Sequence, residues 1–219
     1  MTYEWDFSFL LQYKGLIAIG ALYTIGFTIV TAIAGFVVGG LIAVARLADA
    51  RVVTLPLLAF IEIFRCTPVL VQLVWIYYAL PIVIGVELKP ATAAFIALTL
   101  YGASFFAEII RGGIASIDTG QWDAGRALGM RRAALMRRVV LPQALKRMIP
   151  PLVNQVVLQL KNTSLLSVLA VPDLLYQGQL ITSATYKPLE VYTMIAVIYF
   201  IILFPLTTLA HGLERRLAR

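Results

Sequence analysis

Cysteine is almost absent from this chain of 219 residues, which contains one, Cys66. A lone cysteine excludes a disulfide framework and a cysteine-rich metal site, so neither cross-links nor zinc can hold the fold together. Charged residues are also scarce, at 13% of the chain, whereas hydrophobic residues make up 61%. Soluble domains average about 25% and 45–50%, so this chain has too few polar residues to coat a globule. The composition predicts an integral membrane protein.

Sequence motifs of nucleotide-binding and catalytic sites are missing as well. No Gly-rich loop ending in Lys-Ser/Thr is present, so the chain is not itself an ATPase. The only histidine, His211, lies at the end of the last apolar run, where an interfacial role is expected. No nucleophile-and-base pair is visible. We therefore predict no enzymatic activity, no metal and no cofactor bound by this chain.

Long apolar runs define the expected fold. A hydrocarbon core about 30 Å thick needs roughly 20 apolar residues as helix, and only helices or closed barrels satisfy their backbone groups there. No internal repeat or linker divides the chain, so residues 1–219 are predicted to form one all-α membrane domain. Its five transmembrane helices are expected at about 14–46, 53–84, 90–111, 149–172 and 190–212.

The distribution of basic residues gives the orientation. Most arginines follow the first, third and last runs, whereas only Lys14, Lys89 and Lys187 lie on the other side. Because basic loops stay in the cytoplasm, we predict a multi-pass protein of the bacterial inner membrane, with its N-terminus outside and its C-terminus cytoplasmic. This topology accounts for the net charge of +7 without nucleic acid.

Two pairs of residues predict packing. Gly35 and Gly39 have the spacing that brings two helices into close contact, within one chain or in a dimer. Glu108 and Arg111, three residues apart at the end of the third run, fit an ion pair at a helix end.

The polar segment at about 112–148 interrupts the apolar pattern. Gly112 and Gly113 are expected to end the third span, and Asp118 or Thr119 to cap a short helix with one apolar side. One interpretation is an amphipathic helix that lies on anionic lipid through the neighbouring arginines.

The residue types and spacing in this segment favour another interpretation. It resembles the cytoplasmic coupling loop of bacterial ABC importer permeases, which reads Glu-Ala-Ala, then Gly, then Ile-x-Leu-Pro, with Asp123 here in place of Glu and Val139 in place of Ile. The resemblance implies a coupling helix between the third and fourth spans that inserts into a cleft of a separate ATP-hydrolysing subunit. The residues implied in coupling are Asp123, Ala124, Gly125, Gly129, Leu141 and Pro142.

Charged residues also occur inside the apolar runs. Glu62 and Arg65 lie in the second run and Lys161 in the fourth, at a cost of about 2.5–3.5 kcal/mol each in lipid. At 1.5 Å per residue, Arg65 and Lys161 lie about 18 Å and 16 Å from the cytoplasmic ends, near the midplane. Glu62 and Arg65 can neutralise one another on one helix face. Pro68, however, frees the carbonyl of Phe64, and such loosened helices form the solute sites of many transporters.

These segments resemble motifs of the polar amino-acid uptake subfamily of ABC permeases. The second-span motif covers Glu62 to Gln72, and Lys161-Asn162-Thr163-Ser164-Leu165 is similar to the fourth-span motif. Arg65 can grip an α-carboxylate with two bonds and Glu62 can receive an α-ammonium. Asn162 replaces an Asp that is common in the subfamily, which favours neutral or acidic solutes. The substrate-binding residues implied are Glu62, Arg65, Thr67, Gln72, Lys161, Asn162 and Thr163.

The resemblance implies a permease subunit of a binding-protein-dependent ABC importer that translocates a polar amino acid or related zwitterion. Its implied partners are two ATPase subunits that bind ATP and Mg, and a periplasmic or extracellular solute-binding protein. Because five spans are too few to enclose a path alone, we also expect a second permease subunit, identical or homologous. The rival hypothesis is a channel or ion-coupled carrier whose basic loop binds lipid.

Overall fold

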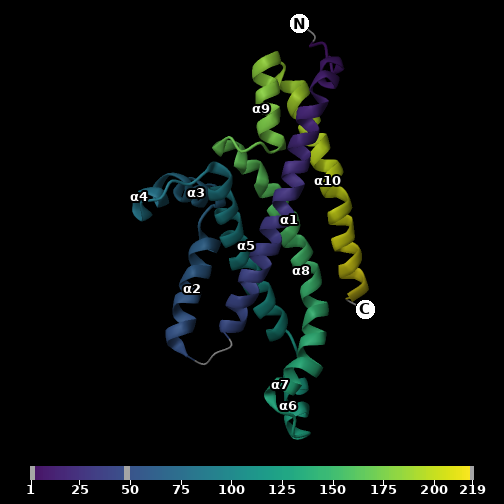
Figure 1. The fold of residues 1–219 in the computed structure, drawn as a ribbon. Coiled ribbons are helices and arrows are strands. Elements are labelled where there is room, and N and C mark those ends of the chain that lie inside the picture. Colours follow the sequence, from purple (N-terminus) through teal and green to yellow (C-terminus); the bar gives the residue numbers. More distant parts are fainter. Residues whose placement is uncertain (1–2, 47–49, 218–219) are drawn as a thin grey trace.

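The computed structural model describes residues 3–46 and 50–217, and every regular element in these ranges is a helix. Figure 1 shows the long helices running side by side, with two short helices at one end. The long helices are α1 (Lys14–Ala45), α2 (Arg51–Cys66), α5 (Pro90–Ala115), α8 (Leu141–Asn162), α9 (Leu174–Thr185) and α10 (Pro188–Leu217). The short ones are η1 (Ser8–Tyr13), α3 (Val69–Val74), η2 (Trp75–Ala79), α4 (Leu80–Ile84), α6 (Thr119–Ala127), α7 (Arg132–Leu135), η3 (Met136–Val140) and η4 (Thr163–Leu169).

Three stretches of the described chain are long and apolar enough to cross a membrane: Ser8–Ala45, Pro90–Ala115 and Pro188–Leu213. Two further candidates are bent pairs, namely α2 with Val69–Ile84 and Arg132–Leu169 with α9. The number of spans reaches five only if each bent pair is one span. The predicted number of five spans therefore requires that each bent pair crosses the membrane once.

Close contact between α1 and α5 organises the bundle. A Cβ atom on Gly39 would lie 2.6 Å from the Ala103 carbonyl oxygen, and one on Gly35 would lie 3.2 Å from the Thr99 carbonyl oxygen. Only glycine allows the two backbones to approach this closely. The predicted glycine pair thus packs two helices of the same chain.

The range 53–84, predicted as the second span, contains a sharp bend at Pro68, where the sequence predicts a loosened helix. The chain turns by 109° between α2 and the segment formed by α3, η2 and α4, which projects sideways from the long helices at the left of Figure 1. Thr67 is extended, with φ −107° and ψ 142°, because a residue before proline avoids the helical conformation. The segment ends at Gly85, whose φ is +69°.

The boundaries around the polar segment also differ from the predicted ones. α5 continues past Gly112 and Gly113 to Ala115, and α8 begins at Leu141 instead of 149. Gly113 does not end its helix: it is buried, and any side chain there would collide with Met148 of α8. The predicted cap at Asp118 is confirmed, since its carboxylate accepts a hydrogen bond from the Gly120 N–H at 2.6 Å.

A small apolar core stabilises this polar segment. It consists of the buried residues Ile117, Leu135, Val140, Ala144 and Met148, which join the connection before α6 to α7, η3 and the first turns of α8, and Trp122 of α6 packs against it. The segment is therefore a folded unit continuous with α5 and α8, which links its position to theirs.

Candidate functional site

Gln72 holds the bend between α2 and α3. Its side-chain nitrogen donates to the carbonyl oxygens of Phe64 at 2.8 Å and Thr67 at 3.0 Å, and to the Thr67 hydroxyl at 2.7 Å. Pro68 lacks the N–H that would serve Phe64 in a continuous helix, so the amide of Gln72 takes its place. The Phe64 carbonyl thus lacks its helical N–H donor, as predicted, and the Gln72 side chain donates to it instead.

A cavity of about 460 Å³ adjoins the bend. Thr67 and Gln72 line it, together with apolar residues of α2, α3, η2, α4 and α5 that include Phe64, Trp75 and Ile96. Glu62 and Arg65 are not among its lining residues. Of the four predicted second-span residues, two therefore line this cavity and two do not.

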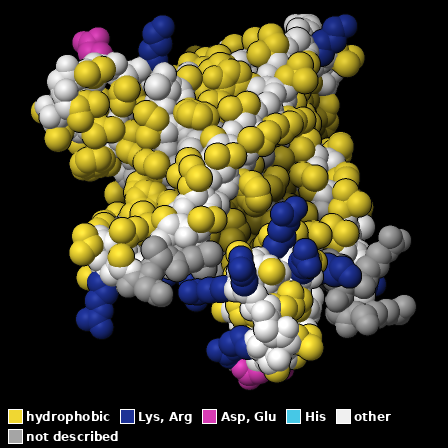
Figure 2. All heavy atoms as spheres, turned by 60° about the horizontal axis from the view of Figure 1, so that its bottom comes forward, with side chains coloured by type: hydrophobic (Ala, Val, Ile, Leu, Met, Phe, Trp, Pro, Cys, Tyr) yellow, Lys and Arg dark blue, Asp and Glu magenta, His cyan; other side chains and the backbone are white. Residues whose placement is uncertain are grey.

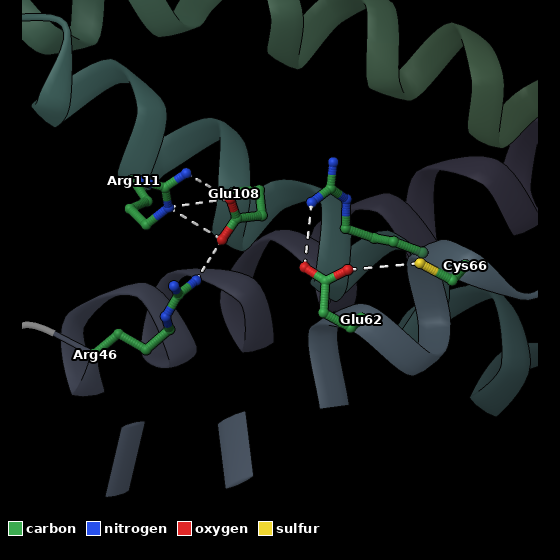
Figure 3. Close-up of polar contacts among 6 residues, drawn as sticks. Arg46, Glu62, Cys66, Glu108 and Arg111 are labelled. Carbon is green, nitrogen blue, oxygen red and sulfur yellow. Dashed lines mark hydrogen bonds and ion pairs between the residues drawn. The ribbon is translucent and has the colours of Figure 1, made fainter. Parts of the chain in front are cut away.

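Glu62 and Cys66 lie on one face of α2 (Figure 3), and Arg65, three residues after Glu62, shares that face. The Arg65 Nη1 atom lies 3.9 Å from the Glu62 Oε1 atom, within ion-pair range but too far for a hydrogen bond. The Arg65 guanidinium lies 5.7 Å from the centre of the Phe105 ring of α5, and the Cys66 thiol donates to Glu62 at 3.5 Å. The side chains of Arg65 and Glu62 are 38% and 58% exposed, so both charges are accessible.

Glu108 provides a contrast with the same sequence spacing. The two oxygens of its carboxylate share the single N–H of Arg111 Nε, at 3.0 and 3.1 Å, and the carboxylate also accepts one hydrogen bond from Arg111 Nη2 at 2.8 Å and one from Arg46 at the end of α1. Glu108 is 17% exposed. The predicted helix-end pair is confirmed and includes a third residue, Arg46 (Figure 3). This closely bonded cluster ties α1 to α5, whereas the Glu62–Arg65 pair is loosely joined.

The fourth-span residues lie where α8 passes into η4. Lys161 is exposed, Asn162 is half-buried and Thr163 is fully buried, with its hydroxyl donating to the Leu160 carbonyl at 2.7 Å. No ion pair joins Lys161 to Glu62 or to any other acid in residues 3–46 and 50–217. Of the three, Lys161 and Asn162 are accessible in the chain as it stands.

In the polar segment, α6 carries the predicted coupling residues. Asp123 is 65% exposed and forms an ion pair with Arg126, and Ala124 is also exposed. Gly125 is buried because the Leu135 side chain occupies the space that its own side chain would take. Gly129 ends α6 in the left-handed conformation, with φ +71°, and the Met130 N–H closes the turn on the Gly125 carbonyl at 3.0 Å.

Leu141 and Pro142 form the first turn of α8, where proline is favoured, and both are at least partly exposed. Leu128, which sequence reasoning did not select, is 81% exposed at the end of α6. An apolar side chain this exposed on a folded loop is a candidate contact for another protein. Figure 2 shows Lys and Arg side chains gathered around this end of the molecule, with apolar side chains covering the flanks.

Sequence reasoning also missed Asp173. This residue is fully buried and caps α9 by accepting hydrogen bonds from the N–H groups of Tyr176 at 2.9 Å and Leu175 at 3.2 Å. The Tyr199 hydroxyl of α10 lies 3.5 Å away. An Asp directly before an apolar run is a cap signal that was available in the sequence.

These features define a class: a helical membrane subunit with a bent span at its centre and a compact polar loop at one end. Residues 35–219 match the family described as binding-protein-dependent transport system inner membrane component. The chain belongs to this family of multi-pass inner-membrane permeases. The predictions of an importer permease and of a non-enzymatic role are confirmed by this membership and by the relatives, which are themselves permeases.

The chain is 37% identical over 215 residues to the glutamine transport system permease protein GlnP of Escherichia coli K12, covering 98% of both chains. It is 38% identical over 201 residues to the L-cystine transport system permease protein TcyB of Bacillus subtilis 168, covering 91% of this chain and 86% of that one. A crystal structure of an amino acid ABC transporter with histidines matches with a TM-score of 0.92 at 36% identity, covering 98% of this chain and 100% of that one. An inward-facing MetNI methionine ABC transporter shares the fold, with a TM-score of 0.76 at 23% identity, covering 95% and 99%.

Proposed function

We propose that this permease translocates a polar amino acid or a related zwitterion, and that Glu62 and Arg65 hold its charged head. The observation that carries the proposal is the accessible, loosely joined pair next to the bend in the second span. Relatives named for glutamine and cystine transport, and a similar structure named for an amino acid ABC transporter, support the same solute class.

The geometry suits a zwitterion for a simple reason. At 3.9 Å, the pair gains little from its own contact, so a solute can insert between the two groups without breaking a strong bond. The Arg65 guanidinium then donates two N–H groups to the α-carboxylate, and the Glu62 carboxylate accepts from the α-ammonium. Two charges that are costly in the membrane thereby gain partners from the solute.

The other predicted contacts take more specific roles in this proposal. Lys161 and Asn162 are accessible and would meet the solute side chain, with Asn162 favouring neutral or acidic solutes. Thr163 supports them from its buried position. Thr67 and Gln72 maintain the bend that presents Glu62 and Arg65, and they line the neighbouring apolar cavity.

A second permease subunit, identical or homologous, is part of the proposal. Glu62 and Arg65 are 58% and 38% exposed in the single chain, although they belong to a candidate membrane span. Charges in spans face a partner or a water-filled path. We therefore expect the face of α2 that carries them to border a path shared with a second subunit.

The proposed assembly also contains two ATPase subunits, which bind ATP and Mg, and an external solute-binding protein. The chain would lie with its N-terminus outside and its C-terminus in the cytoplasm, so that the polar segment meets the ATPases. Coupling would then involve Asp123, Ala124, Leu141 and Pro142 as accessible residues, with Gly125 and Gly129 shaping α6.

Uptake by reconstituted vesicles tests the solute site. With the cognate ATPase and solute-binding protein, Arg65→Ala and Glu62→Gln are each expected to lower ATP-dependent uptake at least about tenfold, because a charged hydrogen bond contributes about 1.5–3 kcal/mol. Arg51→Ala is the matched control, since it removes a charge at the other end of α2. Unchanged uptake in both site variants at equal protein levels contradicts the proposal.

A further inference from the structure

A second cavity, of about 330 Å³, lies where the ends of α1 and α5 meet α6. Arg46 lines it from α1, and Arg111 and Ile114 line it from α5. Thr119 and Trp122 line it from α6, and Ile117 from the connection before it. The cavity thus combines two guanidinium groups with an apolar wall, and it touches both the spans and the polar segment.

The charges of the described residues around this cavity do not balance. Among these residues, Arg46 and Arg111 share a single carboxylate, that of Glu108, which leaves one positive charge in excess. Each guanidinium carries five N–H donors, and Glu108 engages only part of them. In the part of the chain that the structure describes, no other ion pair involves Arg46 or Arg111. The Arg111 side chain is 50% exposed, so its remaining donors are accessible.

The location of the cavity limits its ligand. Ser8–Ala45 and Pro90–Ala115 are both candidate spans, and both end at this cavity. Lys and Arg side chains surround the same end of the molecule (Figure 2). The cavity therefore lies at a membrane boundary on the basic side, where phosphate groups of anionic lipids are the most abundant anions.

We propose that this cavity binds a phosphate group, supplied by the headgroup of an anionic phospholipid. The Arg111 fork and the remaining donors of Arg46 match phosphate oxygens, and Ile114 and Trp122 offer an apolar surface to the glycerol and upper acyl region. A lipid bound there contacts α1, α5 and α6 together, so it fixes the position of α6 relative to the spans. A soluble phosphate compound presents the same headgroup chemistry without the apolar part.

Quenching of Trp122 by brominated lipids tests this proposal in the full-length chain. Trp5 and Trp75 are replaced by Phe so that Trp122 is the only tryptophan, and the protein is placed in nanodiscs. At 10 mol% brominated lipid, we expect phosphatidylglycerol to quench at least about twice as strongly as phosphatidylcholine. Equal quenching by the two lipids overturns the proposal.

Matched arginine variants test whether the stronger quenching by phosphatidylglycerol depends on this cavity. Arg111→Gln is expected to reduce phosphatidylglycerol quenching to the phosphatidylcholine level, whereas Arg51→Gln, which removes a charge outside the cavity lining, retains the difference. An equal loss in both variants indicates general surface charge and overturns the site. If Arg111→Gln does not fold, Arg111→Lys, which keeps the charge and loses the fork, is used and is expected to lose more than half of the difference.

A soluble competitor distinguishes the two sources of phosphate. Glycerol phosphate at 10 mM is expected to leave the phosphatidylglycerol quenching unchanged, because it lacks the apolar part that the cavity wall contacts. Complete reversal of the quenching by this compound overturns the lipid assignment in favour of a soluble ligand.

Discussion

At the scale of single residues, Gln72 has the most specific task in the described chain, because one amide group satisfies two backbone carbonyls at a bend. The Phe64 and Thr67 carbonyls have no helical N–H available, since Pro68 interrupts the helix. Gln72→Met keeps the side-chain volume and removes the donor. We expect it to lower the free energy of unfolding by about 1–3 kcal/mol, measured as a lower thermal midpoint in detergent.

Gln155 is a suitable control for this substitution. It is buried like Gln72, at 3% and 7% exposure, but its side-chain nitrogen has no partner among the described residues. Gln155→Met is therefore expected to leave the thermal midpoint unchanged or to raise it. Equal destabilisation by the two substitutions is evidence against a special role of Gln72.

At the scale of elements, α6 ends in an exposed apolar residue, and the turn at Gly129 fixes the conformation of this helix end. Leu128 is 81% exposed, and burying a leucine side chain against a partner contributes about 1.5–3 kcal/mol. Leu128→Ser is expected to reduce the amount of ATPase that co-purifies with the chain about tenfold or more. The measurement is the ratio of the two subunits after affinity purification.

Leu11→Ser serves as the control for α6. Leu11 is 75% exposed in η1, at the opposite end of the molecule from α6. Its substitution is expected to leave the subunit ratio unchanged. A ratio that falls in both variants, or in neither, argues against docking through α6.

The elements also show how far the sequence determines the fold. Apolar runs located the three helices of the described chain that are long and apolar enough to cross a membrane, because a helix in lipid needs about 20 apolar residues in sequence. The Thr67–Pro68 break was detectable, but its angle of 109° was not, since it depends on tertiary contacts such as that of Gln72 with the α2 end. Gly113 was read as a helix end because its neighbour in space, Met148, is not its neighbour in sequence.

The candidate site was accessible to sequence reasoning where its parts are local. Glu62 and Arg65 were recognised because they lie one helical turn apart in an apolar run. The Glu108 cluster was only half recognised, since Arg46 lies 62 positions away from Glu108. The sequence pattern does not show which residues of α2 line the cavity, because the cavity forms only when α2, α3 and α5 pack together.

At the scale of the whole molecule, the N-terminal segment is joined to the start of α10. Lys187 Nζ donates to Asp6 Oδ2 at 2.6 Å, the Tyr3 hydroxyl donates to Glu190 at 2.6 Å, and the Lys187 ammonium lies 5.0 Å from the Phe9 ring. The Lys187 ammonium, and then Ser8, hold the pKa of the Asp6 carboxyl well below its usual range.

This contact makes the stability depend on pH in a defined direction. Because the folded-state pKa of Asp6 is lowered, its contribution is complete above the unfolded-state value of about 3.9 and is lost as the pH falls further. We expect the thermal midpoint of the wild-type chain to decrease below pH 4 more steeply than that of Lys187→Gln. Parallel curves contradict the assignment, and Lys89→Gln, another lysine on the predicted outer side, is the control.

The continuity of α8 has a mechanical consequence. Its 22 residues reach from Leu141, beside α6, to Asn162, next to Lys161, a length of about 33 Å. The helix continues through Pro150 and Pro151, although these two residues lack the N–H groups that would bond to the carbonyls of Lys146 and Arg147. Because the helix is continuous, a tilt imposed on its Leu141 end is expected to displace the residues at its far end, around Lys161.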